Sequence, residues 1–84
     1  MADQQFSMTD LMDLLVQKVG LPNRDRTDDP DVKFADVGLD SLAFLQLDTE
    51  LASRYGVELP DRPATITFRE ITDAVNEHLR ENAA

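Results

Sequence analysis

The chain contains no cysteine, which excludes disulfide bonds and thiolate metal sites, so any thiol chemistry has to come from an added group. No apolar run approaches the roughly 20 residues of a membrane span. Met1 to Gln5 lack the basic start and the apolar stretch of a signal peptide. These absences predict a cytoplasmic protein that does not engage a membrane.

Basic residues are also scarce. The 8 Lys and Arg residues stand against 17 Asp and Glu residues, which gives a formal net charge of −9. This charge argues against binding nucleic acid through a basic patch, and it favours partners with basic surfaces. A chain of 84 residues can form one core and bury about 63% of its unfolded surface. We therefore expect residues 1–84 to form a single monomeric domain with little room for a deep substrate cavity.

Helical spacing of the apolar residues predicts an all-α fold with three main helices and one short helix. The first helix is expected to begin within residues 7–10, after a frayed tail that includes Phe6, and to stop at Gly20. The second is expected from Ser41 to Tyr55, with Gly56 as its C-terminal stop.

The third helix is expected to begin after Thr67, because Thr67 and Glu70 form a capping box, and to fade near Arg80. The short helix is a single turn expected at residues 62–66. The fold class is therefore a small all-α bundle, with no repeats and no linker that would divide it into domains.

Residues 21–40 are predicted to form a long loop between the first and second helices, rich in Asp and without helical periodicity. A loop of about 20 residues in a compact domain needs a functional reason or its own anchors. The expected anchors are Phe34, Val37 and Leu39, which would hold the place where Ser41 emerges.

The acids of this loop raise the question of calcium. A calcium loop that began at Asp29 would place Lys33 at a ligand position and Phe34 where the sharp turn requires glycine. A solvated acidic loop is therefore favoured, and we expect no metal site.

The helix expected from Ser41 to Tyr55 has two separate apolar faces. The core stripe comprises Phe44, Leu47, Leu51 and Tyr55. The outer stripe lies on the side of Ser41 and comprises Leu42, Leu45, Thr49 and Ala52. A small domain can bury one stripe, so the outer stripe is expected to border solvent and to be offered to another molecule.

Ser41 is the candidate site residue. Asp40 is a favourable N-cap, which leaves Ser41 in the first helical turn beside free backbone N–H groups and the positive end of the helix dipole. A phosphate esterified to this hydroxyl would be electrostatically favoured. A serine hydrolase would need a general base nearby, and the single histidine, His78, is expected to be a partly buried structural residue.

Residues 34–42, Phe-Ala-Asp-Val-Gly-Leu-Asp-Ser-Leu, resemble the attachment motif of the acyl carrier proteins, an apolar lead-in followed by Gly-x-Asp-Ser-Leu. The resemblance continues through the run Arg-Tyr-Gly-Val-Glu-Leu-Pro-Asp at residues 54–61 and covers the chain from about Thr9 to Leu79. It implies that Ser41 carries covalent 4′-phosphopantetheine from coenzyme A, whose thiol holds an acyl group as a thioester. It also implies a carrier that is not itself an enzyme.

The same resemblance implies a set of partner enzymes: a phosphopantetheinyl transferase, a malonyl or acyl transferase, a ketosynthase, and the tailoring enzymes of a synthase. The family's partner-contacting residues match Asp40, Leu42, Leu45 and Thr49 in this sequence. Residues 53–61 look most like carriers of type II aromatic polyketide synthases.

Three alternatives stay open at this point. One is a carrier of fatty-acid synthesis, although Gln46, Ala52 and Ser53 stand where acids are common in that subfamily. A peptidyl carrier usually has a glycine pair before its serine, where this chain has Leu39-Asp40. The alternative from another class is a non-covalent acidic interaction module, such as a nucleic-acid mimic.

Overall fold

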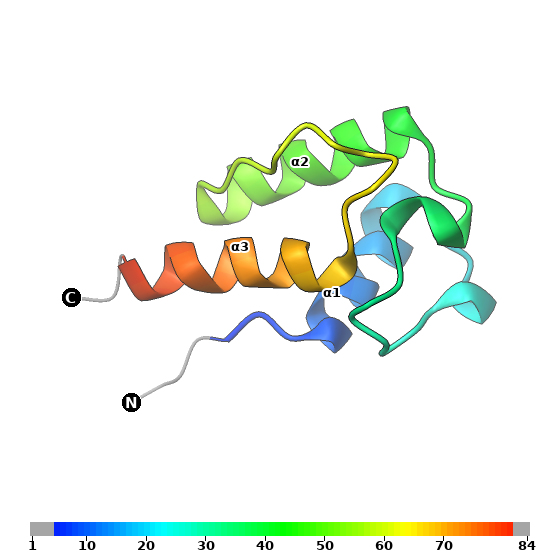
Figure 1. The fold of residues 1–84 in the computed structure, drawn as a ribbon, viewed down its shortest axis with the longest axis horizontal. Helices are drawn as coiled ribbons and strands as arrows, with labels where there is room; N and C mark the ends of the chain where they lie inside the picture. Colours follow the sequence, from blue (N-terminus) through cyan, green and yellow to red (C-terminus); the bar gives the residue numbers. More distant parts are fainter. Residues whose placement is uncertain (1–4, 82–84) are drawn as a thin grey trace.

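The computed structural model describes residues 5–81, and these form an all-helical fold (Figure 1). Its α-helices are α1 (Met8–Leu14), α2 (Ser41–Tyr55) and α3 (Phe68–Glu81). Shorter helical segments between α1 and α2 are a π-helical turn at Leu15–Val19 and 3₁₀ helices at Asn23–Asp25 and Phe34–Val37. The expected all-α fold with a long first loop is confirmed.

The two longer helices, α2 and α3, run in the same direction in Figure 1, and the chain between them returns along α2. Asp48 of α2 holds this returning segment, because its Oδ1 accepts a hydrogen bond of 3.0 Å from the N–H of Leu59. The helical turn expected at residues 62–66 is present as one hydrogen-bonded turn, in which the N–H of Ile66 donates to the carbonyl of Arg62 at 2.9 Å.

The first helix begins within residues 7–10, as the sequence predicted, and the structure shows a capping box there. The Ser7 Oγ accepts from the N–H of Asp10 at 3.1 Å, and the Asp10 Oδ2 accepts from the N–H of Ser7 at 3.0 Å. The helix widens to π-helical pitch after Leu14, which the apolar spacing did not predict. It ends as expected at Gly20, whose φ of 91° lies in the left-handed region.

The prediction of a frayed tail through Phe6 is wrong. The Phe6 side chain is 4% exposed, and its ring lies edge-on to that of Tyr55, with 5.4 Å between the ring centroids. Its N–H donates to Asn76 Oδ1 at 2.6 Å, and its carbonyl accepts from Asn76 Nδ2 at 3.0 Å. These contacts tie the segment before α1 to α3 and to the end of α2. Residues 1–4 of the expected tail lie outside the described residues.

One aromatic side chain joins the loop, α2 and α3. Phe34 is fully buried, with its ring edge-on to Phe44 in α2 at 5.5 Å and to Phe68 in α3 at 6.5 Å between centroids. Val37 and Leu39, the other two expected anchors, are half-buried against the same core. The loop is therefore pinned where the sequence predicted, and most deeply at Phe34.

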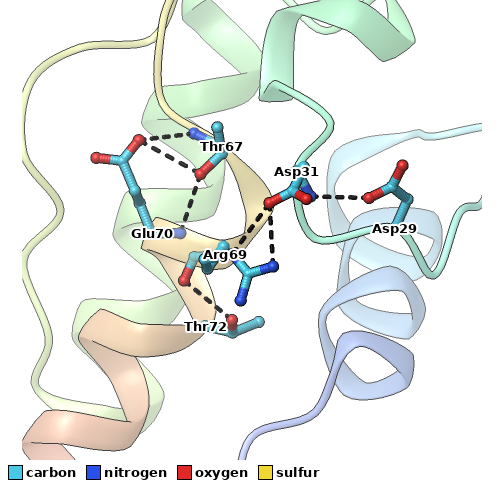
Figure 2. A network of polar contacts seen from close by, with 6 residues as sticks. All are labelled: Asp29, Asp31, Thr67, Arg69, Glu70 and Thr72. Carbon is cyan, nitrogen blue, oxygen red and sulfur yellow. Dashed lines mark hydrogen bonds and ion pairs between the residues drawn. The ribbon is translucent and has the colours of Figure 1, made fainter.

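The third helix also begins at its predicted cap (Figure 2). The Thr67 Oγ1 accepts from the N–H of Glu70 at 3.2 Å, and the Glu70 Oε1 accepts from the N–H of Thr67 at 3.0 Å. The guanidinium of Arg62 pairs with the Glu70 carboxylate from the other side. Together with the Thr67 N–H, this guanidinium lowers the pKa of Glu70 below its ordinary value of 4.5.

Candidate functional site

Ser41 is the first residue of α2, and its side chain is exposed. Asp40 caps the helix, since its Oδ1 accepts from the N–H of Ala43 at 2.9 Å and its carbonyl accepts from the N–H of Phe44 at 3.0 Å. Helix geometry leaves the N–H groups of Ser41 and Leu42 without an intrahelical acceptor. The Ser41 hydroxyl therefore stands in solvent at the positive end of α2, as the sequence predicted.

The backbone turns at a glycine three residues before this serine. The 3₁₀ helix Phe34–Val37 ends at Gly38, which has a φ of 84°. A Cβ at Gly38 would meet no atom within 4 Å, so glycine is favoured there by its backbone conformation and not by lack of space. The left-handed residue turns the chain out of the 3₁₀ helix and into the Asp40 cap.

The two faces of α2 are separated as the sequence predicted. Leu42 is 63% exposed and Leu45 is 58% exposed, and these are the exposed large apolar side chains of the described part of the chain. The rest of the outer stripe, Thr49 and Ala52, is exposed as well. The core stripe is buried at Phe44, Leu47 and Leu51 and half-buried at Tyr55.

The carboxylates of α2 make hydrogen bonds and ion pairs within the molecule. Asp48 accepts the hydrogen bond from Leu59 described above, and Glu50 pairs with Arg54 at 3.1 Å one turn further along. Apart from Arg54, the exposed positions of α2 are uncharged: Ser41, Leu42, Leu45, Gln46, Thr49, Ala52 and Ser53. Near Ser41 the exposed acids are Asp36 and Asp40, both before the helix.

His78 cannot serve as a base for Ser41. A Cβ built at Gly56 would lie 3.3 Å from His78 Nε2, so the imidazole lies against the residue that follows α2. The 15 residues of α2 span about 22 Å at 1.5 Å per residue, with Ser41 at the opposite end. His78 is half-buried, as expected, and a Ser–His hydrolase pair is excluded.

Residues 5–81 contain no group of three or more His, Asp or Glu side chains arranged to hold a metal ion. Within the same residues, no helix has the length and apolar character needed to cross a membrane. The features that remain at the start of α2 are an exposed hydroxyl, a helix N-terminus and two exposed leucines.

A family model described as the phosphopantetheine attachment site matches residues 9–75, which include the loop, α2 and the first part of α3. The chain belongs to the acyl carrier proteins. Members of this family bear covalent 4′-phosphopantetheine, and they are carriers rather than catalysts. The match favours a covalent carrier over the alternative of a non-covalent acidic module.

Relatives of this carrier include acyl carrier proteins of polyketide synthases. It is 46% identical over 55 residues to the actinorhodin polyketide synthase acyl carrier protein of Streptomyces coelicolor, covering 63% of this chain and 64% of that one. It is 37% identical over 82 residues to the monensin polyketide synthase acyl carrier protein of Streptomyces virginiae, covering 94% and 93%. It is 34% identical over 82 residues to the anthracycline acyl carrier protein DpsG of Streptomyces peucetius, covering 94% and 98%. No solved structure is significantly similar to the chain.

These relatives favour the expected assignment to type II polyketide synthase carriers over the fatty-acid alternative. The uncharged outer face of α2 agrees with that preference. The sequence did not reveal three tertiary contacts. Asp48 holds the segment that follows α2 through Leu59, Asn76 holds the segment before α1 through Phe6, and Arg69 holds the loop through Asp31.

Proposed function

We propose that this carrier holds acyl intermediates of a polyketide synthase on 4′-phosphopantetheine esterified to Ser41. The observation that supports this residue is its position. Residues 9–75 contain two serines, Ser41 and Ser53, and both are exposed. Ser41 begins α2, where N–H groups and the helix dipole favour a phosphate, whereas Ser53 lies in the last turn, where the dipole opposes one.

The surroundings of Ser41 fit the group. Attachment requires the Ser41 oxygen to bond to the phosphorus that bears the pantetheine arm of coenzyme A. The bond from that phosphorus to 3′,5′-ADP breaks, and the hydroxyl proton passes to a base of the transferase. An exposed hydroxyl on a rigid first turn meets this requirement, because the attacking oxygen is accessible and its direction is set by the helix.

When bound, the group supplies a thiol that holds an acyl chain as a thioester. The chain's own residues then determine which enzymes dock. Leu42 and Leu45 offer apolar contact beside Ser41, Thr49 extends the same face, and Asp40 supplies negative charge at its edge. We propose this surface for a phosphopantetheinyl transferase, a malonyl or acyl transferase, a ketosynthase and tailoring enzymes. The proposal includes a monomeric, cytoplasmic carrier, one domain over residues 1–84, with no catalytic activity of its own.

The attachment test uses the two serines as a matched pair. The chain is incubated with a broad-specificity phosphopantetheinyl transferase, coenzyme A and Mg²⁺, and its intact mass is measured. We expect a mass increase of one phosphopantetheine group, lost completely in Ser41→Ala and retained in Ser53→Ala. Both alanine variants should remain folded, because both hydroxyls are exposed. Modification of the Ser41→Ala variant would reject the residue, and failure to modify the unaltered chain would reject the function.

A further inference from the structure

The loop that leads to Ser41 is fastened to the start of α3 by an antiparallel β-bridge between Lys33 and Thr67. Three backbone hydrogen bonds accompany this bridge: Phe34 N–H to Ile66 at 2.8 Å, Phe68 N–H to Val32 at 3.0 Å, and Arg69 N–H to Pro30 at 2.8 Å. We call residues 30–34 with 66–69 the clamp. Beyond the clamp, six residues lead from Phe34 to Ser41.

An ion pair between Asp31 and Arg69 also joins the two segments of the clamp (Figure 2). The guanidinium of Arg69 contacts Asp31 Oδ1 through Nε at 3.1 Å and Nη2 at 3.0 Å. Asp31 is itself held, because its N–H donates to Asp29 Oδ1 at 3.0 Å. The carbonyl of Arg69 accepts from Thr72 Oγ1 at 3.1 Å, so the residue is anchored in α3 as well.

The clamp leads directly to the serine's helix. Phe34, whose N–H belongs to the clamp, packs its ring against Phe44, which lies three residues after Ser41 in the first turn of α2. The same ring packs against Phe68 at the start of α3. A displacement of residues 30–34 would therefore move both the first turn of α2 and the backbone that enters the Asp40 cap.

Arg69 is unfavourably placed for its own helix. It is the second residue of α3, where the helix dipole disfavours a positive charge. Its pair with Asp31 adds little stability, because the two side chains are 55% and 74% exposed and such pairs are screened by solvent. A cation that opposes the dipole at an exposed site agrees with a role in holding Asp31, and through it the loop.

We propose that Asp31 and Arg69 are positioning residues for the attachment reaction, which hold the loop so that the Ser41 hydroxyl is presented in one orientation to the transferase. This inference rests on the proposed attachment at Ser41. Neither residue is required to touch the transferase or coenzyme A. Their effect should therefore appear in the turnover number of the transferase and not in its KM for the carrier.

The test is a double-mutant cycle with Asp31→Asn, Arg69→Gln and both together, using the full chain as the transferase substrate. Each single variant should lower kcat about threefold to fivefold, the range open to an exposed charge pair, with KM changed less than about twofold. The double variant should be no slower than the singles. Exchanging the charges, Asp31→Arg with Arg69→Asp, should restore kcat, because the pair is re-formed and aspartate suits the helix start.

Two further measurements make the test specific. Amide hydrogen exchange of Phe34, whose N–H is a clamp donor, should quicken in the single variants and recover in the exchanged pair. The control is a second ion pair of the loop, in which half-buried Arg26 lies 2.8 Å from half-buried Asp13 and joins the loop to α1. Asp13→Asn and Arg26→Gln change net charge by the same amounts and should leave kcat unchanged.

An unchanged kcat in the single variants would overturn the positioning role. A loss of kcat that the exchanged pair does not restore would also overturn it, because it would indicate direct contact with the transferase. An equal loss of kcat in the control variants would overturn it too, because it would indicate an effect of net charge. A lower kcat with Phe34 exchange unaltered would also contradict transmission through the clamp. If the unaltered chain were not modified at Ser41 at all, the proposed function would fail, and this inference with it.

Discussion

At the scale of single residues, Leu45 and Leu51 are a matched pair on opposite sides of α2. Leu45 is 58% exposed and Leu51 is fully buried. Leu45→Ala should therefore lower the free energy of unfolding by less than about 1 kcal/mol, whereas Leu51→Ala should lower it by about 2 to 5 kcal/mol. The denaturant midpoint measures both.

The rate at which a partner enzyme uses the carrier should show the opposite order at a temperature where both variants are folded: Leu45→Ala should lower it more than Leu51→Ala. Leu45 offers apolar contact beside Ser41, while Leu51 affects partners through the shape of the domain alone. Equal destabilisation by both substitutions, with loading intact in Leu45→Ala, would place Leu45 in the core and refute the assignment of the outer stripe.

Glu70 should make the stability of the domain depend on pH, and the Glu70→Gln variant can separate this contribution from others. The Arg62 guanidinium and the Thr67 N–H lower its pKa in the folded state below the ordinary 4.5. A carboxyl with a depressed folded pKa stabilises the fold above its unfolded pKa, and this contribution is lost as the pH falls through the folded value. We expect Glu70→Gln, which can still complete the capping box, to be less sensitive to acid than the unaltered chain between about pH 6 and about pH 3.

The measurement is the urea midpoint of both proteins across that range. The difference between their midpoints should be largest at the upper end and should shrink toward the acidic end. A difference that stays constant with pH would mean that the charge of Glu70 has no part in stability.

At the scale of elements, the attachment of the N-terminal segment to α3 depends on one side chain. Asn76 both accepts from and donates to the backbone of Phe6, 70 residues away. Asn76→Ala leaves these partly buried backbone groups without their partner and should lower the free energy of unfolding by about 1 to 3 kcal/mol.

The matched control for this substitution is Asn23→Ala, in an exposed position of the loop, where we expect a change within about 0.5 kcal/mol. Chemical shifts of the Phe6 and Tyr55 rings should change in Asn76→Ala and not in the control, since these rings are in contact. A variant as stable as the control would show that burial of Phe6 suffices to hold the segment.

At the scale of the whole molecule, we expect the acidic excess to affect how this carrier docks to its partners. Each of the ion pairs Arg26–Asp13, Arg54–Glu50, Arg62–Glu70 and Arg69–Asp31 joins one base to one acid, so these pairs leave the net charge of −9 unchanged. Docking to a basic partner surface should therefore weaken as salt rises, because exposed charges are screened over about 8 Å at physiological ionic strength.

Asp40→Asn should raise the KM of the transferase or of a cognate ketosynthase at low salt, and the difference should vanish at high salt. Asparagine is the suitable replacement because it can still cap α2 by accepting from Ala43, whereas Asp40→Lys would also remove the cap and lower stability by about 1 kcal/mol. A KM indifferent to both salt and Asp40→Asn would disprove the electrostatic part of the account.

The sequence by itself determined the features that depend on neighbours within one or two helical turns. Local hydrogen bonds and the 3.6-residue period account for the start of α1 within residues 7–10, the bounds and two faces of α2, the N-caps at Asp40 and Thr67, and the left-handed stop at Gly56. The motif around Ser41 is also continuous in sequence, which is why the attachment chemistry could be inferred before the fold was known.

The tertiary structure alone decided how these local pieces are held together. Phe6 is hydrogen-bonded to Asn76 at a separation of 70 residues, and within the clamp Arg69 pairs with Asp31 across 38 residues. For Phe6, the local sequence signal of burial was its position as a hydrophobic residue before an N-cap. For Arg69, the local signal of a tertiary contact was a cation at the start of a helix. Neither pattern predicts which residue is contacted. Pairing over such separations depends on the surfaces that the packed core brings together and not on any periodicity along the chain.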